Sequence, residues 1–268
     1  MQHCEWRETQ RTFCSLRVPP HSLSGEADAG RGRLPVRAAS ARRMSSSLPP
    51  SNASYLDTAP RQVPGLHSLH RMVSLLLGET TPDDARVLVV GAGGGMETKA
   101  LADAHPGWSF DGVDPAEDML RLAGWTVRDH ASRVRFHQGH IEDAPEGPFD
   151  AAVCLLTFHF ISRDARLETL RQIHRRLTPG APFALAHISF PQTEPERSVW
   201  IARHAAYGAA DGAAPALLER ARHALGTRLT ILAPTEEELM LREAGFAAVS
   251  LFWAALSFKG WLAHTAKL

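Results

Sequence analysis

The chain has 268 residues, of which 44% are hydrophobic and 22% charged, enough to build one substantial α/β domain rather than two. Its 29 Lys and Arg residues balance its 29 Asp and Glu residues. This balance leaves no global basic field of the kind that grips a long nucleic acid through its phosphates. We therefore expect a small-molecule substrate and no extended nucleic acid.

Cysteine content and hydropathy narrow the class further. The three cysteines, Cys4, Cys14 and Cys154, are too few and too scattered for a disulfide framework or a zinc site. The pair His137 and His140 lacks a third ligand nearby, so we predict no metal site. There is no run of 18 apolar residues and no secretion signal. These features indicate a cytoplasmic protein without a membrane anchor.

The first 54 residues differ from the rest in composition. Arg, Ser, Pro and Gly dominate residues 1–54 and no apolar periodicity is present, so we expect a disordered extension before a domain at 55–268. A genuine flexible extension and a natural start at Met44 both explain this. Apolar residues with helical spacing at 66–76 predict the first helix, which packs on a sheet or over the site and ends at 78–79.

A glycine turn follows the first predicted strand. The apolar run 86–90 leads into Gly91, Gly93 and Gly95 and then into a helix. Such a turn lets the free N–H groups of the next helix face a ligand. A dinucleotide fingerprint requires a small residue where Met96 stands, and no Gly-Lys-Ser/Thr follows to form a phosphate loop. The turn indicates a cofactor site, but neither of these two common nucleotide motifs.

An acidic residue ends the next apolar run. Asp114 closes residues 108–114 and lies 23 positions after Gly91. At such a strand end a carboxylate can accept both ribose hydroxyls, each hydrogen bond contributing about 1.5–3 kcal/mol. The alternative is that Asp114 only caps the helix that starts at Pro115. Because the strand, the glycines, the helix and the acid follow one another at the expected spacing, we favour the ligand-binding role of Asp114 over the capping role.

The remaining elements alternate between strand and helix patterns. Strands are predicted at 133–137, 149–156 and 183–188, helices at 163–177 and 235–244, and two final strands at 249–254 and 257–264. Thr235 is the expected N-cap of the last helix and Gly245 its C-terminal stop. Alternation of this kind predicts a doubly wound, mostly parallel sheet completed by an antiparallel hairpin.

A long segment, 191–234, separates the fifth strand from the last helix. Insertions at the carboxyl edge of such a sheet are typically lids or substrate pockets, so we expect a helical lid. On a helix, Trp200, Arg203, His204 and Tyr207 share one face. Either this is an ordinary amphipathic helix, or Arg203 and Tyr207 present their side chains to an anionic group of the substrate.

Taken together, Gly91-x-Gly93-x-Gly95 and Asp114 resemble the motifs of the class I S-adenosylmethionine-dependent methyltransferases. The resemblance implies a seven-stranded Rossmann-like methyltransferase fold and S-adenosylmethionine as cofactor. Carried over position by position, it implies a cofactor site made of Gly91, Ala92, Gly93, Gly95, Asp114, Pro115, Met119, His140, Ile141 and Thr157.

The chain departs from this family at two positions. Family members usually carry an acid where this chain has Val89, and that acid helps hold the methionine ammonium. Either Glu97 takes this role, or Glu97 only compensates the helix N-terminus. His140 also replaces an acid that the family places beside the adenine. A neutral ring nitrogen of His140 can still accept a hydrogen bond, and the backbone of Ile141 is the alternative contact.

Within the superfamily the chain is most similar to the branch that includes the carboxy-S-adenosylmethionine synthases. The similarity lies in residues 157–161, in Arg203 with Tyr207, and in the terminal Phe-Lys-Gly run. It implies either an ordinary methyltransferase acting on a small-molecule acceptor or an enzyme that modifies the sulfonium cofactor itself. The sequence leaves a homodimer open.

Methyl transfer from a sulfonium mainly requires in-line alignment of the acceptor and exclusion of water. If the acceptor must lose a proton, His159 after the fourth strand is our first candidate base and His187 our second. Arg203 and Tyr207 are the candidates for holding the substrate. A nicotinamide-dependent oxidoreductase, which would have to tolerate Met96, and a non-catalytic cofactor-binding module, which would explain Val89, remain as rival hypotheses.

Overall fold

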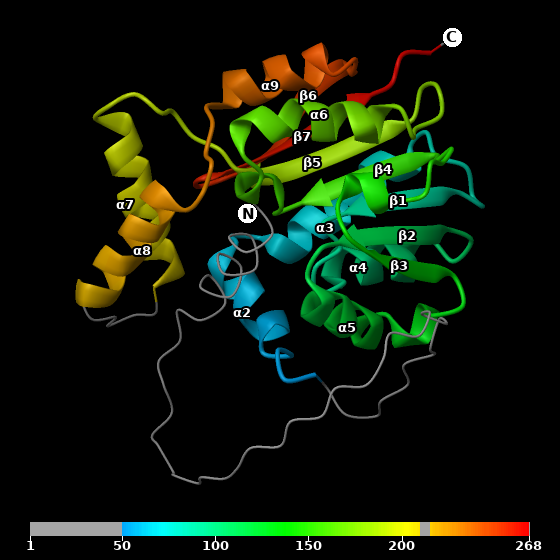
Figure 1. Ribbon diagram of the computed structural model, residues 1–268, viewed down its shortest axis with the longest axis horizontal. Helices are drawn as coiled ribbons and strands as arrows, with labels where there is room; N and C mark the ends of the chain where they lie inside the picture. The colour runs from blue at the N-terminus through cyan, green and yellow to red at the C-terminus, as the bar shows by residue number, and fades with distance from the viewer. Residues whose placement is uncertain (1–49, 210–214, 268) are drawn as a thin grey trace, which may run out of the picture.

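The central feature of the protein is a single mixed sheet. We describe a computed structural model, which defines residues 50–209 and 215–267 (Figure 1). Its strands are β1 (Arg86–Val90), β2 (Ser109–Asp114), β3 (Val134–Gln138), β4 (Ala151–Leu155), β5 (Pro182–Ile188), β6 (Ala247–Ala255) and β7 (Phe258–His264). Their order is β3-β2-β1-β4-β5-β7-β6. Strands β1 to β5 run parallel, and β7 is antiparallel to both β5 and β6. The predicted fold class is confirmed.

Helices cover both faces of this sheet. They are α2 (Tyr55–Gln62), α3 (Leu66–Gly78), α4 (Met96–Ala104), α5 (Glu117–Thr126), α6 (Arg163–His174), α7 (Glu196–Gly208), α8 (Pro215–Thr227) and α9 (Pro234–Glu243), with short 3₁₀ turns η1 (Arg128–His130), η2 (Ile141–Asp143) and η3 (Phe158–Phe160). Helices α3 and α4 pack on one face and α6 and α9 on the other. Burial on both faces explains why the inner strands are almost continuously apolar.

The core follows from the alternation of side chains along β1. Val87 and Val89 point to the face covered by α3, where they join Leu69 and Val73. Leu88 points to the opposite face, which is covered by α6 and α9. Successive residues of a strand face opposite sides, so one apolar strand supplies both layers of the core.

The sheet places a topological switch point beside the glycine turn. From β1 the chain goes outward to β2 and β3, then returns to the other side of β1 as β4. The chain therefore leaves the carboxyl ends of the neighbouring strands β1 and β4 in opposite directions. Ligands of open α/β sheets bind at such a switch point. Gly91 follows β1 and Thr157 follows β4, so both lie at this point.

The N-terminal boundary of the described chain differs from our expectation. The predicted disorder of residues 1–49 lies outside the described residues. Residues 50–54, expected to be disordered, form turns that lead into α2, a helix the sequence pattern did not predict. The side-chain amide of Asn52 donates to the backbone oxygen of Asp118 at 3.0 Å. This contact fixes the start of the described chain on α5.

The insertion between β5 and α9 is helical, as predicted, except that residues 210–214 lie outside the described part. Helices α7 and α8 pack on each other at the left of Figure 1, and α7 also contacts α2. The N-cap of helix α9 lies two residues earlier than expected: it is Ala233, not Thr235, and Pro234 is the first helical residue. No helix in the described ranges is both long and apolar enough to cross a bilayer.

Candidate functional site

The glycine turn packs tightly on two sides. Gly91 and Gly95 have φ angles of 73° and 77°, a left-handed conformation that glycine adopts without strain. A Cβ atom at Gly95 would lie 2.9 Å from the Cα of Ala123 on α5. A Cβ atom at Gly91 would collide with the side chain of Thr157. The turn is therefore fitted between α5 and the end of β4.

Gly93, in the middle of the turn, faces open space instead. A Cβ atom there would have only the Gly91 carbonyl oxygen, at 3.5 Å, and the terminal carbon of Met119, at 3.9 Å, within 4 Å. Open space therefore lies next to the main chain of the turn, with Met119 of α5 on one side. This is where a ligand can approach the main chain closely.

Asp114 ties the glycine turn to α5. Its Oδ2 accepts the N–H of Gly93 at 2.9 Å, and its Oδ1 accepts the N–H of Ala116 at 2.8 Å. The residue is 1% exposed, and burial raises the pKa of its carboxyl to about 6 although both N–H groups favour the charged form. Asp114 therefore binds the N–H of Ala116, the N-cap residue of α5, and is not itself the N-cap of that helix. Each oxygen keeps a further lone pair with which to accept a ribose hydroxyl.

Glu97 brings a second buried carboxyl to the same place. It lies in the first turn of α4, lines the cavity and is 9% exposed. Burial, with a smaller contribution from the nearby Asp114 carboxyl, raises the pKa of Glu97 to about 8. A cation beside Glu97 would lower this pKa again, because it stabilises the carboxylate. The cavity therefore holds an acid poised to ionise when a positively charged group binds.

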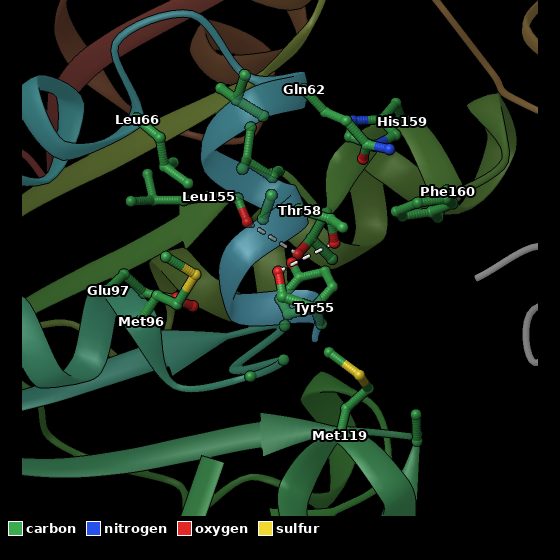
Figure 2. A pocket seen from close by; sticks show the side chains of 18 of the residues that line it. Tyr55, Thr58, Gln62, Leu66, Met96, Glu97, Met119, Leu155, His159 and Phe160 are labelled. Carbon is green, nitrogen blue, oxygen red and sulfur yellow. Dashed lines mark hydrogen bonds between the residues drawn. The ribbon is translucent and has the colours of Figure 1, made fainter. Parts of the chain in front are cut away.

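One cavity of about 380 Å³ extends from the glycine turn to His204 in the second half of α7, within the usual range for small-molecule sites. Figure 2 shows that α2 runs along it and contributes Tyr55, Thr58 and Gln62. We call one part the cofactor end, lined by Gly91, Gly93, Met96, Glu97 and Met119. We call the other the histidine end, lined by Gln62, Leu66, His70, His159, His204 and Phe258.

Three elements bring histidine rings to the histidine end. His70 comes from α3, His159 from η3 and His204 from α7. Burial lowers the pKa of His70 and of His204 to about 4. Burial also holds the pKa of His159 well below 6.5, with smaller contributions from His187 and Arg166. All three rings lining the cavity are neutral at pH 7.

A buried ion pair fixes the turn that carries His159. Arg166 of α6 pairs with Glu237 of α9, and both side chains are at most 1% exposed. Arg166 also donates to the backbone oxygens of Ile161, at 3.2 Å, and of Thr230. The N–H of Thr230 in turn donates to the backbone oxygen of His159 at 3.0 Å. The position of His159 therefore depends on contacts from two distant helices.

Strain is present where β4 enters the cavity. Leu156 has a φ of 60°, a conformation that is rare for a bulky side chain, and it lines the cavity. Its N–H donates to the backbone oxygen of Ala186 at 2.6 Å, which holds it there. Strained backbone of this kind is concentrated at ligand sites.

Several residues expected at the site line the cavity and others do not. Gly91, Gly93, Glu97, Met119, Thr157 and His159 line it. Ala92, Gly95, Asp114 and Pro115 form the buried or half-buried support beneath it, Ile141 is buried in the core on the other face, and His140 is exposed. His187, our second candidate base, lies on β5, is fully buried beside Glu237 and does not line the cavity. His137 pairs with Asp111 at 2.7 Å.

The expectation for the insertion has to be revised. Arg203 is exposed and its guanidinium lies over the ring of Trp200 at 4.8 Å, while Tyr207 is 44% exposed. Neither belongs to the cavity lining. His204, on the adjacent side of α7, is turned inward and hydrogen-bonds the hydroxyl of Ser257 at 2.5 Å. The helix was predicted correctly, but its inward face was not.

Sequence reasoning missed the contribution of α2, and it predicted the helix that is α3 without singling out His70. Asn52, Tyr55, Thr58 and Gln62 line the cavity although no motif pointed to them, and Pro60 interrupts the apolar pattern of α2. The only available signal for His70 was its place on the helix face that also carries Leu66 and Val73.

Comparison with known proteins agrees with this geometry. The methyltransferase domain family profile matches residues 88–183, which include the glycine turn, Asp114 and β4. A carboxy-S-adenosyl-L-methionine synthase from Dichelobacter nodosus is 24% identical over 213 residues, covering 79% of this chain and 88% of that protein.

Solved structures show the same fold. A SAM-dependent methyltransferase from Aquifex aeolicus has a TM-score of 0.55 at 19% identity and covers 82% of this chain and all of that one. An O-methyltransferase family protein from Burkholderia thailandensis has a TM-score of 0.56 at 14% identity. This chain spans 56% of the length of the Burkholderia protein. The methyltransferase domain match, the glycine turn, the sheet order and these similarities together indicate a class I S-adenosylmethionine-dependent methyltransferase.

Proposed function

We propose that this enzyme transfers the methyl group of S-adenosylmethionine to a small-molecule acceptor bound at the histidine end. The observation that carries the proposal is that one cavity is lined both by the glycine turn and by His159. A donor held at the cofactor end and an acceptor held at the histidine end would share this space. Holding two reactants in one enclosed site is the main requirement for methyl transfer.

The residues at the cofactor end fit S-adenosylmethionine. Gly93 leaves main chain open to the methionine portion, and Glu97 offers a buried carboxyl for the ammonium. Asp114 retains acceptor capacity for the ribose, and Met119 lies where an apolar side chain would contact the adenine. Thr157 lines the cavity beside Gly91, next to the place we assign to the sulfonium. When bound, the cofactor supplies an electrophilic methyl group, and the electrons of its carbon–sulfur bond stay on sulfur.

His159 is the group we assign to the reacting atom of the acceptor. The N–H of Ile188 donates to Nδ1 of His159 at 3.5 Å, so the neutral ring carries its proton on Nε2. The lowered pKa keeps the ring neutral, and the Nε2–H group can donate a hydrogen bond that orients the oxygen of an acceptor hydroxyl. The proton of that hydroxyl leaves to solvent as the methyl group is transferred. Helix α2 lies along the cavity and limits the entry of water (Figure 2).

The alternative of an enzyme that modifies the cofactor itself has less support. A carboxyl-bearing substrate or product requires a positively charged partner in the site. Arg203, the expected partner, is exposed and lies over Trp200. We therefore favour methyl transfer to an acceptor over carboxylation of the sulfonium.

Calorimetry with S-adenosylmethionine, S-adenosylhomocysteine and NAD tests the cofactor. We expect the first two to bind and NAD not to bind. Asp114→Ala should weaken S-adenosylmethionine binding at least tenfold, since one hydrogen bond to a charged group contributes about 1.5–3 kcal/mol. Asp114→Asn, which keeps one acceptor oxygen, should lose less. Unchanged affinity in Asp114→Ala would refute the assignment of this residue.

The acceptor role of His159 is tested by transfer of a labelled methyl group to the low-molecular-weight fraction of a cell extract. We expect His159→Ala to slow transfer about 100-fold or more while cofactor affinity stays within threefold. His140→Ala, which changes an exposed histidine outside the cavity, is the matched control and should behave as the parent protein. Equal loss in both variants, or loss of cofactor binding in His159→Ala, would contradict the role.

A further inference from the structure

We propose that the histidine end selects an uncharged, hydroxyl-bearing acceptor and that His70 and His204 determine this selectivity. The inference deepens the proposed function and rests on it. Side chains from several elements converge at the histidine end. His204 packs on Phe258 with ring centroids 5.3 Å apart, and Phe258 pairs with Ile188 across the sheet. The N–H of Ile188 reaches His159.

His70 closes the opposite side of this space. It lies on α3 four residues after Leu66, so both side chains share the helix face that lines the cavity. His70 is 6% exposed, and within the described ranges no side chain or backbone group hydrogen-bonds its ring. A buried imidazole without a partner is a ready hydrogen-bonding group for a ligand.

The charges around the histidine end exclude an anionic acceptor. Considering the described residues, no Arg or Lys belongs to the cavity lining. Two cations on elements that border this end are held by other contacts. Lys259 donates to the backbone oxygens of Leu256 and Phe258, at 3.0 and 3.3 Å, and its ammonium lies over Trp200. Arg166 is paired with Glu237 behind η3. A carboxylate or phosphate would therefore be buried without a countercharge.

A cationic acceptor is equally unsuited. Three carboxyl residues line the cavity, Glu97, Glu117 and Asp118. Glu97 is assigned to the methionine ammonium, and Glu117 and Asp118 precede Met119 on α5 at the cofactor end. The three rings at the histidine end are neutral because burial lowers their pKa values. A neutral imidazole offers one N–H donor and one acceptor nitrogen, and a hydroxyl group matches both. The apolar walls formed by Leu66, Ile188 and Phe258 favour an apolar body around that hydroxyl.

Three probes of matched size test the proposal: 2-naphthol, 2-naphthoate and 2-naphthylmethylammonium. Each is titrated into the full chain saturated with S-adenosylhomocysteine. We expect 2-naphthol to bind at least tenfold more tightly than either charged probe. Equal or tighter binding of a charged probe overturns the inference, and so does failure of 2-naphthol to bind. Failure of S-adenosylhomocysteine itself to bind would instead refute the proposed function.

Variants assign the selectivity to residues. His204→Arg should reverse the order, so that 2-naphthoate binds more tightly than 2-naphthol, because it adds the missing countercharge. His70→Leu should weaken 2-naphthol binding at least threefold, whereas His70→Gln, which keeps a donor and an acceptor, should restore most of it. Arg203→Ala, an exposed change on the same helix as His204, should leave all three affinities unchanged. An unaltered order in a folded His204→Arg variant overturns the role of His204.

Discussion

The two ends of the cavity are built in different ways. The cofactor end comes from two short stretches, the glycine turn after β1 and the segment after β2, which adjacent parallel strands bring together. The histidine end comes from α2, α3, η3, α7 and β7, elements that lie far apart in the chain. Local sequence sets the first, and long-range packing sets the second. Mutations should therefore damage the two ends through different physical effects.

The largest effect is expected at the support of the histidine end. Arg166→Met leaves Glu237 buried without its partner, which should lower the free energy of unfolding by about 3–5 kcal/mol. Arg163→Met, three residues earlier on α6, breaks only an exposed pair with Glu236 at 3.3 Å. That control should cost less than about 1 kcal/mol. Denaturant unfolding of both variants measures the difference.

A similar loss in Arg166→Met and in Arg163→Met would mean that the buried pair does not support the histidine end. The folded fraction of Arg166→Met could still bind S-adenosylhomocysteine and yet no longer bind an acceptor. This result would show that the two ends are energetically separate.

The next largest effect concerns the cofactor end. Gly95→Ala places a Cβ atom against the backbone of Ala123 at a φ of 77°, and this should cost about 1–3 kcal/mol of stability. The displaced turn should also lose cofactor affinity. Gly124→Ala, on α5 next to Ala123, is the control because a Cβ atom there has nothing within 4 Å. In this helix it should be neutral or stabilise by up to about 1 kcal/mol.

Thermal melting and calorimetry distinguish these two glycine variants. If Gly95→Ala kept the parent's melting temperature and cofactor affinity, the tight fit between the glycine turn and α5 would not be needed for binding.

The cofactor end could be predicted from the sequence because its geometry is local. An apolar strand, glycines that allow positive φ, and an acid at the next strand end are all legible in a single pass through residues 86–114. The sheet could also be predicted, because an alternation of strand and helix patterns is compatible with few sheet topologies. Even there, the hydrogen bonds of Asp114 to Gly93 and Ala116 became known only from the structure.

The histidine end could not be predicted because no local pattern encodes it. On α7 the spacing of Trp200, Arg203, His204 and Tyr207 defines one helix face but not which part of that face turns inward. Packing against Phe258 and Ser257 decides this in favour of His204. From its chemistry alone, Arg203 was the natural choice for a substrate site, but tertiary contacts place its side chain outside the cavity.

A smaller effect, dependent on pH, should come from Glu97. Its pKa in the cofactor-free protein is about 8, so at pH 7 the carboxyl is about nine-tenths protonated and must lose its proton to pair with an ammonium. Cofactor affinity should therefore rise with pH towards 8, up to about tenfold per pH unit, with a proton released on binding. Glu97→Gln should remove this dependence. Calorimetry in buffers of different ionisation enthalpy measures the proton release.

The same residue makes a separate prediction for stability. The pKa of Glu97 is raised above its unfolded value of about 4.5, so its contribution favours folding below that pH and is lost as pH rises towards 8. The cofactor-free parent should lose stability relative to Glu97→Gln across this interval. Parallel stability curves for the two proteins would show that Glu97 is not buried as described, and would remove the basis for pairing it with the ammonium.

The smallest effect is expected from shortening the chain. A protein that starts at Met44 keeps the earliest described contact at the site, the bond from the amide of Asn52 to the backbone oxygen of Asp118 at 3.0 Å. It also keeps Tyr55, whose ring lies close over Gly94. Because residues 1–43 show no periodic apolar face, we expect an unchanged melting temperature and cofactor affinity. A start at Tyr55 removes Asn52 and should weaken cofactor binding a few-fold by freeing α2. A loss of several degrees already at the Met44 start would mean that the first residues dock on the domain.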